Sequence, residues 1–180
     1  MPQQSFSAQV AAFQEQAEKK MRAVFRESAQ DVVADMQTTG WSVASTAAAI
    51  AEGLGGKGRG KNYKPIQGPV LSAGEGGNMP VDTGFLRSSL QISIDGEFPS
   101  ATRENPERVT HNYNPEPVNL LINGAEIGQT INAGYTAKYA PHVEYGARGR
   151  APRRFVGLAA QRWQEIVNRV VARLNGSSVP

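Results

Sequence analysis

Residue types that commonly carry out chemistry are few in this 180-residue chain, and their spacing matches no familiar catalytic set. The absence of cysteine excludes thiolate nucleophiles, thiolate metal ligands and disulfides, and the two histidines, His111 and His142, are far apart in the sequence. A carboxylate metal site would have to use four scattered acidic residues, Asp82, Asp95, Glu126 and Glu144. Nothing in their spacing requires such a site. We therefore expect a protein without enzymatic activity, metal or cofactor, and a carboxylate metal enzyme remains the outside alternative.

Residues 53–62 are rich in glycine and match two phosphate-binding patterns in part. Their glycines have the spacing of the dinucleotide fingerprint, and the same stretch fits most of a P-loop. Both motifs need a helix directly after the loop, whereas Pro65 follows here, and Asn62 stands where a P-loop has Ser or Thr to ligate magnesium. We therefore interpret residues 53–80 as a flexible basic loop that a partner orders, and not as a nucleotide site.

Positive charge is concentrated in two zones, although the formal net charge is only +3. Between positions 53 and 80 there are four basic residues and one acidic residue, Glu75. Between positions 148 and 180 there are seven arginines and one acidic residue, Glu165. Such zones favour contact with an acidic protein or with nucleic acid, and solvated arginines on a helix face are the simpler alternative. The residues that we expect at an interface or facing DNA are Lys57, Arg59, Lys61, Lys64, Glu144, Arg148, Arg150, Arg153 and Arg154.

A turn at residues 81–90 separates the glycine- and proline-rich part of the chain from the rest. We expect Asp82 and Thr83 to cap backbone N–H groups with their side-chain oxygens. Gly84 allows a backbone conformation that other residues resist. The apolar anchors that follow are Phe85, Leu86 and Leu90.

Residues 5–37 have the periodicity of one long amphipathic helix. Its stripe consists of Phe6, Val10, Phe13, Ala17, Met21, Val24, Ser28, Val32 and Met36. We expect Ser5 or Ser7 as the N-cap and Gly40 as the stop, with a weaker second helix over residues 41–52. A helix of about 30 residues is about 45 Å long. It therefore either forms part of the core of its own domain or packs in part on a neighbouring subunit.

Alternating apolar residues after the turn predict a small antiparallel sheet of three or more strands. The expected strands are 91–95, 118–122 and 126–131, and Asn123-Gly124 is expected to form a tight turn between the last two. Leu90, Ile92 and Ile94 would then face inward. Residues 96–117, which contain four prolines, are expected to be irregular.

The C-terminal part predicts a short aromatic turn or helix over residues 137–146 and then a closing amphipathic helix. Pro152 suits the first turn of that helix, and Asn175-Gly176 suits its end. For Glu144 we expect an ion pair with Arg87, Arg148 or Arg150, either within one chain or across a subunit.

The expected fold class is α+β, in which a small antiparallel sheet is packed by the long N-terminal helix and the C-terminal amphipathic helix, with long irregular loops. We expect a single domain over residues 1–180, with an N-terminal helical region (1–52), the flexible loop (53–80), an α+β core (81–174) and a tail (175–180). No apolar run approaches the roughly 20 residues of a membrane span, and the first residues lack a signal-peptide pattern. We therefore expect that the protein does not associate with a membrane and that it is assembled in the cytoplasm.

Three segments together carry a family resemblance: residues 81–89 (VDTGFLRSS), 139–146 (YAPHVEYG) and 151–155 (APRRF). In this order, before an amphipathic helix, they resemble the neck or minor tail-component family of long-tailed bacteriophages. That family is similar to the tail-completion proteins of lambdoid phages. The match covers about half of the chain, and the sequence departs from the family pattern in the long stretches 53–80 and 96–117.

The resemblance implies a structural, non-enzymatic virion protein of the head–tail connector, assembled in the host cytoplasm. It implies a homo-oligomeric ring, expected to be six-fold, around the DNA channel, which acts in tail completion or head–tail joining. Other connector and tail proteins would be its partners, with non-specific contact to genomic DNA in the channel. The alternative that the residues themselves suggest is a DNA-binding module that uses the basic loop and the cluster from Arg148 to Arg154.

Overall fold

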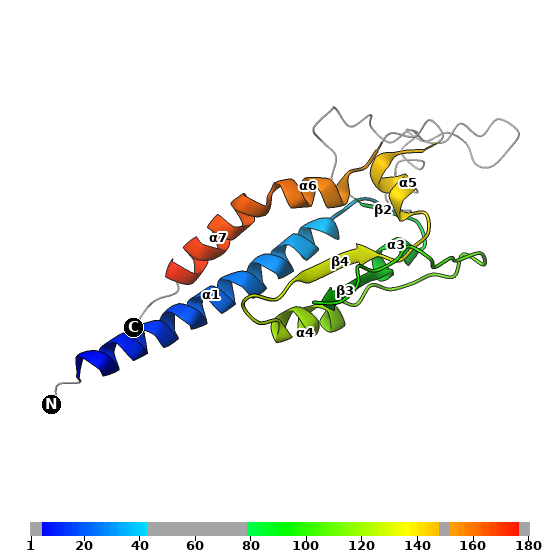
Figure 1. Cartoon of the computed structure of the whole chain (residues 1–180). Coiled ribbons are helices and arrows are strands. Elements are labelled where there is room, and N and C mark those ends of the chain that lie inside the picture. Colours follow the sequence, from blue (N-terminus) through cyan, green and yellow to red (C-terminus); the bar gives the residue numbers. More distant parts are fainter. Residues whose placement is uncertain (1–4, 43–78, 148–151, 177–180) are drawn as a thin grey trace, which may run out of the picture.

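The computed structural model describes residues 5–42, 79–147 and 152–176. In chain order its elements are α1 (Phe6–Met36), β1 (Thr39–Ser42), β2 (Met79–Val81), α3 (Phe85–Ser88), β3 (Leu90–Ile94), α4 (Glu116–Gly124), β4 (Ile131–Tyr135), α5 (Ala140–Tyr145), α6 (Phe155–Gln161) and α7 (Trp163–Gly176). The fold is α+β, as expected, and Figure 1 shows a long helix beside a small strand layer.

Helix α1 confirms the long amphipathic helix that the periodicity predicts. Ser5 is its N-cap, and the Ser5 hydroxyl accepts a hydrogen bond from the N–H of Ala8 at 3.4 Å. The expectation that Gly40 ends the helix is wrong, because the helix ends at Met36 and Gly40 lies inside β1. After the helix the chain pairs with β2. The first hydrogen bond of this pairing is donated by the Met79 N–H to the Thr38 carbonyl at 2.8 Å.

The strands pair in two separate places. Strands β1 and β2 are parallel, whereas β3 and β4 are antiparallel, in a register that runs from Leu90 opposite Tyr135 to Ile94 opposite Ile131. Strand β3 confirms the expected strand to within a residue, and Leu90 is buried as predicted. The expected sheet of three or more strands is wrong for the described residues, in which each sheet has two strands. The expected second helix over 41–52 begins inside β1 and otherwise lies outside the described residues.

The expected strand at residues 118–122 is wrong, because these residues form helix α4. A run of five residues that is mostly apolar has no period of its own, so it suits a buried strand and a buried helix equally well. The decisive signals lie just before it. The Asn114 side chain accepts from the N–H of Glu116 at 3.0 Å, and a proline occupies the first turn, where its missing N–H costs nothing.

The expected hairpin at Asn123-Gly124 and the strand at 126–131 are also wrong. Both residues belong to the last turn of α4, and β4 begins only at Ile131. The intervening turn is held by Asp95, whose carboxylate accepts from the N–H of Thr130 at 2.7 Å and from the amide of Gln129 at 2.8 Å. The tight-turn dipeptide thus ends a helix here, a role that glycine also serves.

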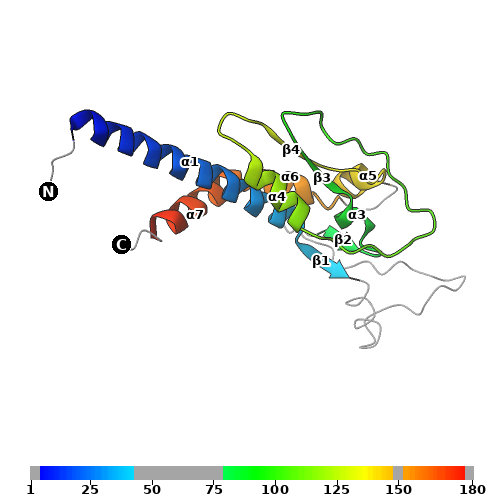
Figure 2. The same ribbon diagram turned by 90° about the horizontal axis from the view of Figure 1, so that it is seen from below.

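The closing helix differs from the expected one at its start. Pro152 lies before the helix and not in its first turn, because α6 begins at Phe155, after Arg154 in a left-handed conformation with φ of 50°. A short irregularity at Arg162 separates α6 from α7, which ends at Gly176 as expected. Figures 1 and 2 both show α6 and α7 running back along α1 in the opposite direction.

One cluster of buried side chains connects these elements. It brings together Val33, Met36, Phe85, Leu86, Leu90, Val118, Ile122, Tyr135, Phe155 and Ala159. Tyr135 lies at its centre, since its ring packs edge-on against Phe155 with the ring centroids 5.2 Å apart. The Tyr135 hydroxyl donates to the Met36 carbonyl at 3.3 Å, and its burial raises the pKa of Tyr135 well above the ordinary value. The end of α1, strand β4 and helix α6 are therefore joined at one residue.

Candidate functional site

The segments that carry the family resemblance meet in space. We call their meeting place the motif junction, made of residues 81–89, 139–146 and 152–157. The rings of Phe85 and Tyr139 lie 6.2 Å apart, and backbone hydrogen bonds join the segments at the carbonyls of Val143 and Glu144, which accept from Arg153 at 3.0 Å and Arg154 at 3.1 Å. Three stretches that are far apart in the sequence thus form one packed unit.

Gly84 is required in the motif junction for two reasons. Its φ is +76°, a left-handed conformation that is costly for residues with a Cβ atom. In addition, a Cβ atom built there would lie 2.1 Å from the carbonyl oxygen of His111. The His111 backbone is held against this turn by its own N–H, which donates to the Thr83 carbonyl at 2.7 Å.

The two residues before Gly84 behave differently from each other. The Thr83 hydroxyl accepts from the N–H of Phe85 at 3.4 Å, which is the capping role expected of it, although the bond is long. The carboxylate of Asp82 is instead engaged in an exposed ion pair with Arg108. The segment from Arg108 to Tyr113 therefore lies across the turn, and a hollow of about 210 Å³ remains between the two.

Within the described residues, Glu144 binds backbone N–H groups and not an arginine; Arg148 and Arg150, two of its expected partners, lie outside these residues. Its side chain is buried, and its two carboxylate oxygens accept hydrogen bonds from the N–H groups of Val156 at 3.0 Å and Gly157 at 2.8 Å. A carboxylate at this position satisfies backbone N–H groups that the start of α6 leaves without partners, and it faces the positive end of the helix dipole. Glu144 thus joins the end of α5 to the start of α6, and Arg87, the expected partner within the described part, lies instead over the ring of Tyr113, 5.2 Å from its centroid.

The predicted basic residues are only partly placed. Lys57, Arg59, Lys61, Lys64, Arg148 and Arg150 lie outside the described residues. Arg153 is half-buried and Arg154 is exposed, directly before α6. The structure does bring other arginines together, along α7.

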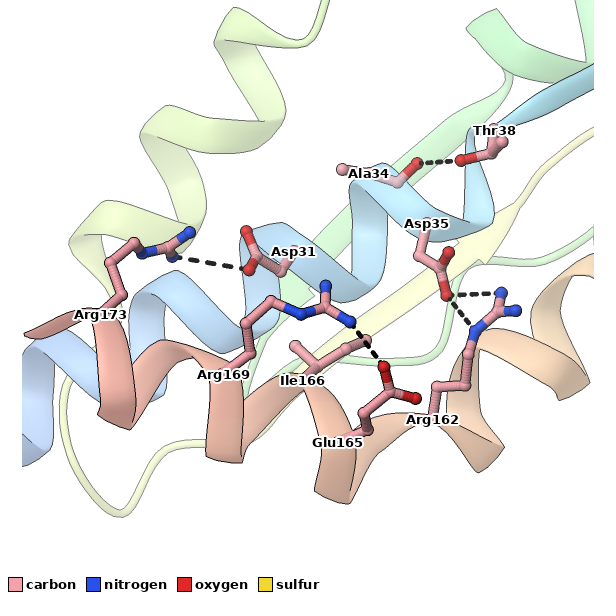
Figure 3. Close-up of a pocket in the computed structure, with 9 residues that line it drawn as sticks. All are labelled: Asp31, Ala34, Asp35, Thr38, Arg162, Glu165, Ile166, Arg169 and Arg173. Carbon is pink, nitrogen blue, oxygen red and sulfur yellow. Dashed lines mark hydrogen bonds and ion pairs between the residues drawn. The ribbon is translucent and has the colours of Figure 1, made fainter.

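These arginines line a groove of about 520 Å³ between α1 and α7, shown in Figure 3. Arg162 directs two guanidinium nitrogens at one carboxylate oxygen of Asp35, at 2.8 and 2.7 Å. Arg173 lies 2.8 Å from Glu27 and 3.5 Å from Asp31, and its hydrogen bond to Glu27 is the main cause of its raised pKa. The groove is therefore built from ion pairs that cross from one helix to the other.

Opposite charges compensate each other along this groove. The remaining arginine, Arg169, pairs with Glu165 one turn earlier on α7 at 2.8 Å. Partly exposed pairs of this kind contribute less than about 1 kcal/mol each, so the groove holds two helices in register more than it drives folding. Its lining contains no histidine, hydroxyl nucleophile near a base, or cluster of uncompensated charge, and we assign no reaction to it.

This groove was not predicted from the sequence, although a signal for it is present there. Glu27, Asp31 and Asp35 follow one another at intervals of four residues and so form an acidic row on α1. Arg162, Arg169 and Arg173 form a basic row on the closing helix. The two rows together indicate a pair of packed helices, whereas the arginines alone do not.

The four scattered carboxylates do not come together as a metal site. Asp82 and Glu126 pair with arginines, Asp95 holds the turn before β4, and Glu144 caps α6. Within the described ranges there is no group of three or more residues of the ligand types Asp, Glu and His that could hold a metal ion.

Comparisons with known proteins found no match to this chain among family models, curated proteins or solved structures. No helix in the described part of the chain is long and apolar enough to cross a bilayer.

Proposed function

We propose that this chain is a structural subunit of the head–tail connector of a long-tailed bacteriophage. In this role it acts in tail completion or head–tail joining, as part of a homo-oligomeric ring around the DNA channel, expected to be six-fold. It would be assembled in the host cytoplasm and remain in the virion, in contact with other connector and tail proteins.

The convergence of the three resembling segments is the observation that carries this proposal. Short motifs match by chance when each is taken alone. Here the Phe85–Tyr139 contact and the hydrogen bond from the Arg153 N–H to the Val143 carbonyl bring all three segments into one packed unit. That the residues of the resemblance pack together supports the proposal.

A nonsense codon in the gene for this chain, placed in the phage genome that encodes it, tests the proposal. We expect DNA-filled heads and separate tails to accumulate, and supply of the full chain from a plasmid to restore joined particles. An unchanged yield of joined particles, from which mass spectrometry finds the chain to be absent, would overturn the proposal.

The alternative is a DNA-binding module that uses the basic loop and the cluster from Arg148 to Arg154. Of these residues only Arg153 and Arg154 belong to the described part of the chain, and the further arginines Arg162, Arg169 and Arg173 are paired with carboxylates. The affinity of the full chain for duplex DNA, measured by titration at low salt, distinguishes the structural subunit from the DNA-binding module. A DNA-binding module requires an affinity that falls by about 0.9 log unit per phosphate contact for each decade of salt. A structural subunit requires no such affinity.

A further inference from the structure

The first half of α1 differs sharply from the second in what surrounds it. Phe6 is 82% exposed and Phe13 is 73% exposed, and Val10 and Met21 on the same stripe are exposed as well. Further along the helix Val33 and Met36 are buried in the core. In both views of the ribbon, the first half projects beyond α4 and α7 (Figures 1 and 2). We call residues 5–21 the arm.

The composition of the outer part of the arm, residues 5–14, is that of an interface and not of a solvated helix end. Residues 5–14 contain no charged side chain, whereas charged residues are frequent from Glu15 to Asp35. A helix surrounded by water is expected to be polar on all faces. Depletion of charge around exposed aromatic residues is instead typical of the centre of a protein–protein interface.

A second apolar surface lies on the outer side of α4. Val118 and Ile122 face the core, yet Leu120 is 74% exposed, and Leu121 and the nearby Ile127 are also exposed. A helix that is apolar on both sides is normally covered on both sides. We call Leu120, Leu121 and Ile127 the α4 patch.

The arm and the α4 patch of one chain cannot cover each other. Arg26 fixes the end of α4 against α1, since its side chain donates to the Ala125 carbonyl at 2.7 Å and pairs with Glu126 at 3.0 Å. Phe13 and Phe6 are therefore about 20 and 30 Å further along the same continuous helix, at about 1.5 Å per residue. A straight helix does not fold back over this distance.

We propose that the arm of one chain docks on the α4 patch of a second copy, in a head-to-tail contact. The inference rests on the proposed function in one respect, that the chain is the subunit of a homo-oligomer. Because the two surfaces are different, the contact is heterologous, and repetition of a heterologous contact closes a ring when its rotation allows. The arm and the α4 patch are then the two surfaces through which neighbouring subunits of the ring contact each other.

The exposed apolar area supports a second copy as the occupant. Two phenylalanines at these exposures leave about 300 Å² of apolar surface in water, and with Val10 and Met21 the arm reaches the upper part of the range of about 300–600 Å² for the largest patch on a monomer. With its polar rim, such a patch approaches the roughly 800 Å² that a stable interface buries on each partner.

The lack of cysteine makes cross-linking a clean test. Full-length Ala12→Cys and Gly124→Cys variants keep the apolar side chains of both surfaces: Ala12 is exposed beside Phe13, and Gly124, one turn after Leu120, has open space around an added Cβ atom. They are purified separately, mixed, and treated with a short bismaleimide. We expect a covalent dimer in the mixture that is well above the yield of either variant alone. The matched control pairs Ala12→Cys with Phe98→Cys, an exposed position outside both surfaces, and it should give no such dimer.

Each other outcome contradicts the inference in a defined way. A dimer from Ala12→Cys alone would mean that two arms pair with each other, and no dimer in any mixture would mean that the surfaces do not meet. If light scattering shows an oligomer but cross-linking fails, the head-to-tail contact is wrong while the ring of the proposed function stands. If cross-linking succeeds but joined particles form without the chain, the contact stands and the proposed function fails.

A second variant tests the same contact without a cross-linker. Phe6→Glu combined with Phe13→Glu places two carboxylates in the proposed interface, where burial of unpaired charge is strongly unfavourable. We expect the oligomer to fall to the single-chain mass of 19.3 kDa with an unchanged circular dichroism spectrum. An oligomer that withstands both substitutions would overturn the assignment of the arm.

Discussion

The motif junction and the arm both depend on phenylalanine, but the chain treats the two regions in opposite ways. Phe155 of the junction is fully buried, and Phe85 is buried beside Tyr139, whereas Phe13 of the arm is 73% exposed. The junction also satisfies its polar groups within one chain, since Glu144 takes up the N–H groups at the start of α6. The same residue type thus closes the fold in one region and remains available for assembly in the other.

The largest effect on stability is expected from truncation of a buried side chain in the motif junction. Phe155→Ala removes a fully buried ring that packs against Tyr135, and we expect it to lower the free energy of unfolding by about 3–5 kcal/mol. Denaturant titration of the monomeric state measures this. A decrease of the free energy of unfolding by less than about 1 kcal/mol would mean that the surrounding side chains fill the space of the missing ring. The motif junction would then be less tightly packed than the structure shows.

Backbone geometry gives the next effect, with a control inside the same chain. Gly84→Ala combines a left-handed backbone with a Cβ atom placed 2.1 Å from a carbonyl oxygen, whereas Gly128→Ala has the same backbone sign and open space around the new atom. We expect a cost of about 1 kcal/mol at Gly128 and about 1–3 kcal/mol more at Gly84. Equal losses of stability at the two positions would contradict the close approach of His111.

Removal of the helix cap should follow in size. Glu144→Ala leaves two partly buried N–H groups without their acceptor, which we expect to cost about 1–3 kcal/mol. Glu144→Gln, which keeps one acceptor oxygen, should recover part of the loss. Glu165→Ala removes an exposed carboxylate of α7 and is the matched control, with an expected change within about 0.5 kcal/mol. If Glu144→Ala resembles this control in thermal unfolding, the cap contributes nothing.

Alkaline pH provides a test of the buried tyrosine. Burial raises the pKa of Tyr135 in the folded state, so its contribution to stability is present below the unfolded-state pKa of about 10 and is lost as the pH rises above it. We expect Tyr135 to lower the free energy of unfolding by up to about 1.4 kcal/mol per pH unit in that range. The Tyr135→Phe variant should show a flatter dependence, and an identical slope in both proteins would contradict the burial of an un-ionised phenol.

The smallest effect on folding is expected in the arm. Phe13→Ala should change the free energy of unfolding of the single chain by no more than about 0.5 kcal/mol, because the ring is largely in water already. The same substitution should weaken the oligomer, which sedimentation at several concentrations measures. A loss of monomer stability comparable with that of Phe155→Ala would erase the difference between the two regions.

Local signals in the sequence were sufficient for several elements. The period of the apolar residues predicted α1 almost to its ends, and Ser5 is the cap that its hydroxyl suggested. Gly84 adopts the left-handed conformation for which glycine is suited. In these cases the free energy of the local conformation depends on the residue itself and on neighbours within one turn. Residue type and spacing are therefore enough to predict that conformation.

Tertiary structure decided the features whose energy depends on distant partners. Residues 118–122 became a helix because Asn114 and the following prolines start one and because the core receives Val118 and Ile122 on one side. The carboxylate of Glu144 found N–H groups twelve and thirteen residues away, and no spacing rule predicts that approach. The amphipathic period of α1 is determined by the sequence alone, but only the positions of α4, α6 and α7 determine that its second half is covered and its first half is not.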